Sequence, residues 1–421
     1  MSNTFIAIVA GAVAMVTSAA VFPLALRFAR RHGIVDNPNA RKLQRVPVPV
    51  FGGVVVYLGI LAGGLVLMAL SPDTVLMWGL VAMTVMMLIG TWDDIRGLSA
   101  SLRLLVEVAL VGVFIAVTGV YIDDLHGLWG IHALDPWAGV PLSVFAGVGI
   151  INAINLIDGV DGYSSGYGMA ACLCFAAAFW SVWSPVMVCM ALVVIGALLP
   201  FFLHNVFGAR SRMFIGDGGT LMLGMLMVVM SFWAISGHGG LDPMERRGFC
   251  IPAFLVAVGC IPVFDTIRVM TMRILRGRSP FRPDKTHLHH LFIDMGFSHL
   301  GAALFILLIN TGVVLIWFTS WQAGLSLDAQ MYVVLALGLL VTFGFYRFMK
   351  KQQNGGPVDA EGYPEGSALW HAMCRLGDWT HREDRRSWRV VREFMDGPML
   401  GGVKMRNAPE EEGWPGGQCP D

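Results

Sequence analysis

The sequence predicts an all-α, polytopic membrane protein of about eleven transmembrane helices. Hydrophobic residues make up 56% of the 421-residue chain, charged residues make up 14%, and the mean hydropathy is +0.65. Soluble proteins are roughly 45–50% apolar and about 25% charged. The apolar residues also gather in stretches close to the roughly 20 residues that a helix needs to cross a bilayer. We therefore expect the lipid bilayer as surroundings and no nucleic acid as a partner.

Apolar stretches define the expected spans. They lie at about residues 4–26, 50–70, 75–90, 102–120, 141–157, 164–183, 185–203, 219–236, 248–271, 301–319 and 329–347. The first resembles a signal peptide in length, but no basic segment precedes it, and Arg27, Arg30 and Arg31 follow it. It is expected to remain as the first transmembrane helix.

Positive charge in the loops predicts the orientation, because cytoplasmic loops carry an excess of Lys and Arg. The basic residues of the first loop are Arg27, Arg30, Arg31, Arg41, Lys42 and Arg45. The loops at 120–140 and 320–328 contain neither Lys nor Arg. The first loop is therefore expected to be cytoplasmic and the amino terminus outside. Counting onward places every polar cluster described below on the cytoplasmic face, and only Arg246 and Arg247 fall on the other side.

A change of composition near Phe348 divides the chain into two expected parts. Residues 1–348 would form the transmembrane domain, and residues 349–421 a polar cytoplasmic tail that is partly helical and partly disordered. Within the tail, Leu369–Met395 combines three Trp residues with many charges, which predicts a helix in the cytosol or on the membrane surface. Disorder is expected beyond Asn407.

An apolar run ends in an acidic, glycine-rich segment at residues 151–166. It contains Asn152, Asn155, Asp158 and Asp161, with Gly159 and Gly162 between them. Asn and Asp are too polar to face lipid, and such residues in membrane proteins usually mark a functional site. The glycines allow a tight turn and a close approach of the backbone to a ligand.

Carboxylates are expected at the ends of other helices too. Asp93 and Asp94 are adjacent, and their repulsion favours a nearby cation or a proton on one of them. The pair therefore suits a divalent metal or a general base, with capping of the helix end as the simpler alternative. Asp217 lies in a Gly-Asp-Gly corner before a helix, which it could instead cap. Asn205 stands at the end of the preceding helix.

A long loop carries His287, His289 and His290 next to several Arg and Lys residues. The spacing fits no familiar structural zinc site, and the neighbouring cations disfavour a metal. Such a group suits an anion such as pyrophosphate, to which His can donate hydrogen bonds. Positive-inside charge alone would explain the Arg residues but not the histidines. At the preceding helix end, Asp265 and Arg268 either face the same ligand or pair with each other.

Carboxylates and basic groups on one membrane face are what phosphoryl transfer requires, since its catalysis rests on positioning and charge neutralisation. A site at the membrane surface implies that one substrate is a lipid. An ion-coupled transporter is a remote alternative, because its acids would lie near mid-membrane rather than at helix ends. A CDP-alcohol phosphotransferase would require an Ala-Arg that Asp158–Gly162 lacks.

Six motifs, in order, resemble the polyprenyl-phosphate N-acetylhexosamine-1-phosphate transferase family. They are Asp36-Asn37-Pro38-Asn39-Ala40-Arg41-Lys42, Pro47–Gly53, Asp93-Asp94, Asn155–Gly162, Gly216-Asp217 and His287–His290. The segment from Ser279 to His290 is similar to the WecA and TagO branch rather than to MraY. The resemblance implies an enzyme of the bacterial inner membrane, with a cytoplasmic active-site face. It would transfer N-acetylglucosamine 1-phosphate from UDP-N-acetylglucosamine to undecaprenyl phosphate and release UMP, as the first membrane step of a cell-envelope glycan.

The resemblance also implies roles for individual residues. Mg²⁺, with Mn²⁺ as an alternative, would be held by Asp217 and Asn155, while Asp93, with Asp94, would deprotonate or orient the lipid phosphate. The residues expected to bind the substrates are Asp158, Asp161, Asn152, Asn205, Arg41, Lys42, Asp265, Arg268, His287, His289 and His290. A homodimer and the identity of the downstream glycan stay open.

The sequence departs from the family pattern at four positions. Gln44 stands where His is frequent and cannot titrate, which puts any proton transfer there in doubt. Arg103 and Glu107 stand where Lys and Gln are common, and Tyr163 replaces a frequent Leu. Another UDP-N-acetylhexosamine or UDP-MurNAc-pentapeptide stays an alternative donor, although the histidine-rich loop argues against the latter.

Overall fold

The computed structural model describes most of the chain. The described residues are 3–37, 46–182, 184–208, 210–237, 240–280, 286–353 and 368–387, with 391 and 395. Arg41, Lys42, Gln44 and the tail beyond Asn407 lie outside these residues, so the predictions made for them stay predictions.

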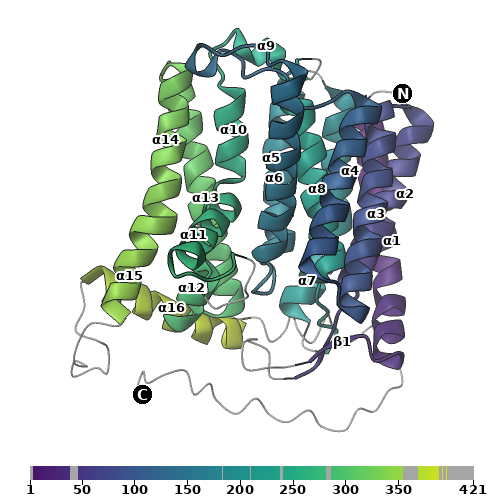
Figure 1. The fold of residues 1–421 in the computed structure, drawn as a ribbon. Coiled ribbons are helices and arrows are strands. Elements are labelled where there is room, and N and C mark those ends of the chain that lie inside the picture. The colour runs from purple at the N-terminus through teal and green to yellow at the C-terminus, as the bar shows by residue number, and fades with distance from the viewer. Residues whose placement is uncertain are drawn as a thin grey trace.

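Long helices stand side by side as an upright bundle (Figure 1). In chain order they are α1 (Asn3–Arg31), α2 (Gly52–Leu70), α3 (Thr74–Arg96), α4 (Ala100–Thr118), α5 (Pro136–Leu156), α6 (Tyr163–Ser181), α7 (Pro185–Phe207), α8 (Gly216–Ile235), α10 (Ile251–Val258), α11 (Cys260–Leu275), α13 (His299–Gln322) and α14 (Leu327–Leu339). The short elements between them are β1 (Val35–Asp36), β2 (Val48–Pro49), the 3-10 helix η1 (Leu128–Gly130), α9 (Asp242–Glu245) and α12 (Leu288–Asp294). β1 and β2 form one antiparallel pair.

The described helices suit a membrane. By length and composition nine of them can cross a bilayer, or ten when the bent pair α10 and α11 is counted as one span. The helix α6 has 19 residues but begins with polar and small ones, among them Ser164, Ser165 and Gly166, which lowers its hydropathy. Each predicted stretch therefore coincides with a helix or with the bent pair, and the prediction of an all-α polytopic membrane protein is confirmed.

The centre of the bundle is α8, whose hydrophobic segment is 94% buried inside the protein. Its first turn lies against α2 and α3 at distances that only glycine allows. A Cβ atom on Gly53 would lie 2.3 Å from the backbone nitrogen of Gly219, and one on Gly90 would lie 2.5 Å from the carbonyl of Asp217. These close approaches bring the carboxyl end of α3 to the amino end of α8.

Helices α10 and α11 meet at an angle of 72° at Gly259. The bend frees backbone groups that Asn310 of α13 satisfies, accepting from the Ile261 N–H at 3.0 Å and donating to the Val258 carbonyl at 3.1 Å. The Tyr167 hydroxyl donates to the same carbonyl at 3.2 Å. The single helix predicted over 248–271 is therefore two helices.

The last membrane helix continues past the predicted boundary at Phe348. A π-helical segment at Leu340–Phe345 (η2) leads from α14 into α15 (Tyr346–Gln353). Beyond it, α16 (Ala368–Ser387) lies across the end of the bundle (Figure 1) and contacts α13. The helix α16 buries Trp370, Met373 and Cys374. Part of the predicted tail is therefore folded against the transmembrane domain.

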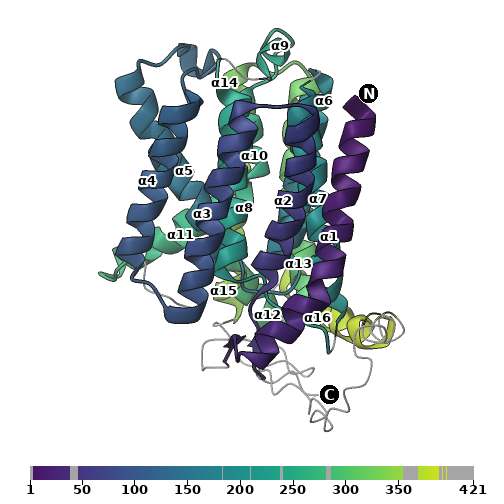
Figure 2. The same cartoon turned by 90° about the vertical axis from the view of Figure 1, so that its right-hand side faces the viewer.

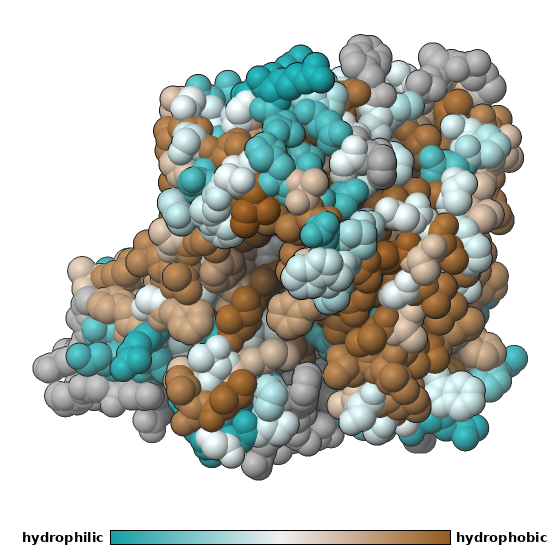
Figure 3. Space-filling view, turned by 45° about the horizontal axis from the view of Figure 1, so that its top comes forward, coloured by the Kyte–Doolittle hydropathy of each residue, from teal (hydrophilic) through white to brown (hydrophobic). Residues whose placement is uncertain are grey.

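The two ends of the bundle carry different elements. The amino terminus and α9 lie at one end, and β1, α12 and α16 at the other (Figures 1 and 2). Hydrophobic residues cover the flanks, while hydrophilic residues gather towards the end that contains α9 (Figure 3). The sequence-predicted polar clusters lie at the end opposite α9.

Candidate active site

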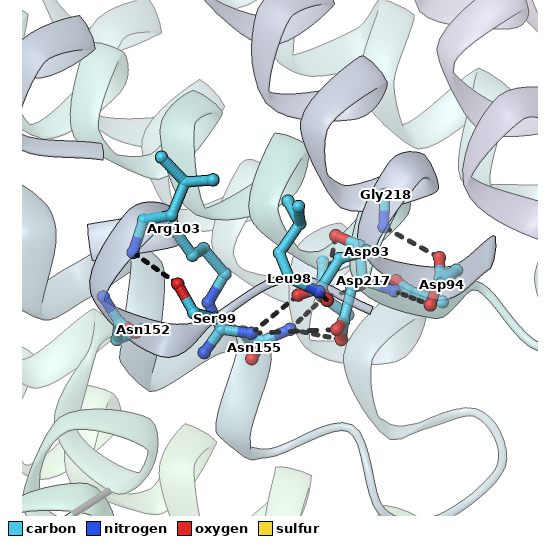
Figure 4. A network of polar contacts seen from close by, with 12 residues as sticks. Asp93, Asp94, Leu98, Ser99, Arg103, Asn152, Asn155, Asp217 and Gly218 are labelled. Atoms are coloured by element: carbon cyan, nitrogen blue, oxygen red, sulfur yellow. Dashed lines mark hydrogen bonds and ion pairs between the residues drawn. The ribbon is translucent and has the colours of Figure 1, made fainter. Parts of the chain in front are cut away.

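Three carboxylates from two helices meet at this end of the bundle (Figure 4). Asp93 and Asp94 belong to the last turn of α3, and Asp217 belongs to the first turn of α8. The glycine contacts described above hold these helix ends together. The structure therefore brings the residues predicted for catalysis close to Asp217, one of the two residues predicted to bind metal.

Asp94 caps α8 from the neighbouring helix. Its two oxygens accept hydrogen bonds from the backbone N–H groups of Asp217 at 3.0 Å and Gly218 at 3.2 Å. The first N–H groups of a helix lack partners within it, and the helix dipole favours a negative charge there. Gly216 has a φ of 71°, and a Cβ atom on it would lie 2.5 Å from an Asp94 oxygen. Asp94 therefore shapes the corner that presents Asp217.

Asp93 has a different environment. One of its oxygens accepts the backbone N–H of Leu98 at 2.6 Å, and the other lies 3.4 Å from Nη1 of Arg103. The side chain is 13% exposed, so Asp93 stays in part open to solvent or a ligand.

Arg103 of α4 lies among three carboxylates. Its Nη1 is 3.4 Å from Asp93 and 3.7 Å from Asp217, and its Nε is 3.6 Å from Glu107. Direct charge-assisted hydrogen bonds are shorter, about 2.7–2.9 Å. Sequence reasoning noted Arg103 and Glu107 as departures from the family pattern and did not place them in the site. The signal was available, because two opposite charges four residues apart inside an apolar span are unusual.

The two asparagines of α5 point to different partners. Asn155 donates from its amide nitrogen to Asp217 at 2.8 Å and to Thr220 at 2.9 Å. Asn152 donates to Glu107 and to the Val148 carbonyl. Asn155 thus contacts the carboxylate cluster directly, whereas the amide nitrogen of Asn152 is used by Glu107 and the Val148 carbonyl.

The loop between α5 and α6 holds Asp158 and Asp161, whose pKa values are shifted in opposite directions. Burial, together with the charges of Asp217 and Asp161, raises the pKa of Asp158 to about 7, although Ser164 donates to it at 2.8 Å. Burial also favours the neutral form of Asp161, but Arg212 and His299 outweigh it and lower the pKa of Asp161 to about 2.

Asn205 ties this loop to α7. It accepts the Gly162 N–H at 2.7 Å and donates to Asp161 at 3.3 Å and to the Met213 carbonyl at 3.0 Å. Arg212 and His299 lie 3.6 and 3.2 Å from the same carboxylate. Sequence reasoning did not select these two residues, since their proximity to Asp161 depends on how the helices pack.

Asp265 anchors the histidine loop. It accepts from Arg268 at 2.6 Å, pairs with Nδ1 of His287 at 2.9 Å and accepts the Leu288 N–H at 3.2 Å. Arg268 also donates to the Thr286 carbonyl and lies 3.6 Å above the ring of Tyr346. Asp265 and Arg268 therefore pair with each other, one of the two alternatives left open by the sequence, and together fix the start of α12.

His289 connects this loop to the acidic loop. A Cβ atom on Gly159 would lie 2.0 Å from Nε2 of His289, so the ring packs directly against the glycine. The ring centroids of His287 and His290 are 5.8 and 4.3 Å away. Burial first, and then these neighbouring histidines, lower the pKa of His289 well below its usual range. The neutral ring is therefore favoured.

The carboxylate cluster can accept a divalent cation. Among the described residues, no three His, Cys, Asp or Glu side chains form a ready-made metal site. Mg²⁺, however, is usually held by one or two carboxylates, with water and substrate phosphates as the other ligands. Asp217 fits this pattern, because Asn155 holds one of its oxygens, Arg103 stays 3.7 Å from the other, and the side chain is 38% exposed. Asn155 uses its nitrogen in both bonds, so its oxygen is the atom that would serve a metal.

Comparison with known proteins gives one consistent family. Residues 76–235 match the family described as Glycosyl transferase family 4. The chain is 31% identical over 304 residues to the probable undecaprenyl-phosphate N-acetylglucosaminyl 1-phosphate transferase of Bacillus subtilis, covering 72% of this chain and 82% of that protein. It is 30% identical over 329 residues to the undecaprenyl-phosphate alpha-N-acetylglucosaminyl 1-phosphate transferase of Escherichia coli, covering 76% and 84%. It is also 30% identical over 350 residues to the decaprenyl-phosphate N-acetylglucosaminephosphotransferase of Mycolicibacterium smegmatis, covering 75% and 83%.

Proposed function

The chain belongs to glycosyl transferase family 4, and from this we propose that it transfers N-acetylglucosamine 1-phosphate from UDP-N-acetylglucosamine to undecaprenyl phosphate. An oxygen of the lipid phosphate forms a bond to the phosphorus that carries the sugar. The bond from that phosphorus to the bridging oxygen breaks, and UMP leaves. The observation that carries the proposal is the meeting of Asp93, Asp217 and Arg103 at one end of a membrane bundle.

Asp93 is the residue proposed to act on the lipid phosphate. It lies 3.4 Å from Arg103, whereas the two oxygens of Asp94 accept backbone N–H groups of α8. Asp93 would orient the attacking phosphate and accept its proton when one is present. Arg103 would offset the negative charge that gathers when two phosphate groups approach each other.

Asp217 and Asn155 are proposed to hold Mg²⁺, which when bound would neutralise the pyrophosphate and support departure of UMP. The α5–α6 loop would receive the nucleotide through Asp158, while Asp161 keeps the loop in shape through Arg212 and His299. The neutral ring of His289 can donate a hydrogen bond to a phosphate or sugar oxygen without adding charge.

The end of the bundle that holds the site is proposed to face the cytoplasm of a bacterial inner membrane, with the amino terminus outside. The helix ends at this side carry Arg30, Arg31 and Arg96, and the loop before α8 carries Arg212, which agrees with the positive-inside rule. A cytoplasmic site also has access to a water-soluble UDP-sugar.

The proposal is tested by measuring UMP release from purified protein with Mg²⁺ and undecaprenyl phosphate. UDP-N-acetylglucosamine, UDP-N-acetylgalactosamine and UDP-MurNAc-pentapeptide are offered in separate reactions. We expect lipid-dependent UMP from the first donor, and its loss when EDTA removes the metal and its return with added Mg²⁺. UMP from another donor alone would change the assigned substrate, and no UMP from any donor with folded protein would overturn the proposal.

A further inference from the structure

Glu107 is a buried carboxyl group that the proposed reaction does not use. It is 1% exposed, and its Oε1 has no hydrogen-bond partner among the described residues. In the described part of the chain, Arg103 is the only cation within 4 Å of that oxygen, with Nε at 3.6 Å. A buried charge paired at this distance costs stability, because desolvation is only partly offset by attraction. A neutral side chain would be expected here if packing alone were required.

The carboxylate of Glu107 is nevertheless held in place. Its Oε2 accepts a hydrogen bond from the amide of Asn152, and Asn152 itself donates to the Val148 carbonyl at 3.0 Å. Both anchors belong to α5, the helix that also carries Asn155. The position of Glu107 relative to the carboxylate cluster is therefore fixed from α5 as well as from its own helix α4.

Arg103 is shared between Glu107 and the reactive carboxylates, which lie at different nitrogen atoms of its guanidinium. Asp93 and Asp217 lie 3.4 and 3.7 Å from Nη1, and Glu107 lies 3.6 Å from Nε. Without Glu107, the guanidinium would be free to close onto Asp217 as a direct ion pair of about 2.8 Å. Such a pair would occupy the oxygen that a divalent cation needs.

We propose that Glu107 is a positioning residue that holds Arg103 away from Asp217 and so keeps Asp217 accessible to a divalent cation. The proposal rests on the assignment of Asp217 as a cation ligand within the proposed function. Arg103 then stays available to interact with the anionic substrate. Asn152, by fixing Glu107, has an indirect part in the same arrangement.

Binding of Mn²⁺ alone, measured by electron paramagnetic resonance on detergent-purified protein without substrate, tests the proposal. In E107Q we expect about five- to tenfold weaker Mn²⁺ binding, because Arg103 moves onto Asp217. In E107D the charge is kept but the carboxylate is one methylene shorter, and a loss of about two- to fivefold is expected. The exposed ion pair of Asp294 with Lys350 supplies a matched control, and D294N should bind Mn²⁺ as the wild type does.

A double-mutant comparison tests whether Glu107 affects Mn²⁺ binding by positioning Arg103 or by its own charge. If Glu107 acts through Arg103, the E107Q change has no further effect on Mn²⁺ affinity in an R103Q background. In the kinetic assay E107Q should raise the Mg²⁺ concentration for half-maximal rate more than it lowers kcat at saturating Mg²⁺. Melting temperatures confirm that each variant is folded, and E107D carries the test if E107Q does not fold.

Three results would overturn the proposal. The first is an unchanged Mn²⁺ affinity in both E107Q and E107D. The second is that E107Q weakens Mn²⁺ binding as much in the R103Q background as in the wild type. The third is that a wild type that releases UMP does not bind Mn²⁺. Failure of the proposed function is distinguishable, because it appears as no UMP from the wild type with any donor, whatever the Mn²⁺ affinity.

Discussion

At the scale of single residues, Gly159 sets how closely the acidic loop approaches the histidine loop. A Cβ atom there would overlap the ring of His289, which is buried and has little room to move. Contacts below 3.0 Å force one of the two groups to shift. We expect Gly159→Ala to lower the rate of UMP release by about tenfold or more, because a misplaced catalytic group is costly.

The matched control is Gly149→Ala in α5, where a Cβ atom meets nothing within 4 Å. It should keep full activity. Wild-type activity in Gly159→Ala would mean that the position of His289 does not matter for the reaction.

Substitutions of the two adjacent carboxylates of α3 are expected to differ in effect, one lowering mainly stability and the other mainly activity. Asp94→Asn removes one of the two oxygens that accept N–H groups of α8, and we expect a loss of about 1 kcal/mol of stability, as for other helix caps. Asp93→Asn removes the proposed catalytic carboxylate and should lower kcat by at least about a hundredfold. Melting temperature and UMP release measure the two effects. The assignment fails if Asp94→Asn loses more activity than Asp93→Asn at equal stability.

The sequence predicted the chemical type of each site residue better than its partners. Asp93, Asp217 and Asn155 stand out because polar side chains are rare at the ends of apolar runs, and the structure brings them together. The capping role of Asp94 could not be assigned, since its partners are backbone groups more than 120 residues away. The opposite charges of Arg103 and Glu107 inside an apolar span could have singled them out, but the carboxylates that surround Arg103 depend on α3 and α8 meeting beside it.

At the scale of secondary structure, the bend between α10 and α11 depends on a side chain from a third helix. Asn310 satisfies both the Val258 carbonyl and the Ile261 N–H. We expect Asn310→Leu, which keeps the volume, to leave the Ile261 N–H unpaired at a cost of about 1–3 kcal/mol, while the Val258 carbonyl keeps its bond from the Tyr167 hydroxyl. The melting temperature should fall, and so should activity, because α11 carries Asp265.

The control for this change is Thr319→Val in the same helix. The Thr319 hydroxyl bonds only locally to the Ile316 carbonyl at an exposed position, so its removal should change little. Equal melting temperatures for Asn310→Leu and the wild type would show that the bend is stable without Asn310.

The positions of the helices could be predicted from the apolar stretches, but the bend within one of them could not. Each apolar stretch coincides with a helix because the membrane requires its backbone groups to bond internally. The bend at Gly259 was missed, because hydropathy does not register where a distant Asn replaces helical hydrogen bonds. Past Phe348, α15 continues to Gln353 into the segment predicted as a partly helical tail, where charged residues extend the helix beyond the apolar span.

At the scale of the whole molecule, the buried histidine links global stability to pH. His289 stays neutral in the folded state, whereas in the unfolded chain it binds a proton below about pH 6.5. Its contribution to stability is therefore complete above about pH 6.5 and is lost as the pH falls towards the lowered pKa. The loss is at most about 1.4 kcal/mol for each pH unit.

We expect the melting temperature in detergent to fall from about pH 7.5 to about pH 5.5, and to fall less in His289→Gln. Asp158, whose pKa is raised to about 7, acts with the opposite sign, because its folded form binds a proton first. The difference between wild type and His289→Gln isolates the histidine. Parallel pH profiles would show that His289 is protonated in the folded protein.

The burial of α8 has a consequence for how the enzyme can change its substrate. The half of the site proposed to bind the metal belongs to α8, which is buried between its neighbours, so a substitution there disturbs the packing of several helices. The half that carries the histidines follows α11, which meets α10 at an angle of 72°. We therefore expect changes in the segment from α11 to α12 to alter which donor sugar is accepted, while the proposed phosphate chemistry next to α8 stays the same.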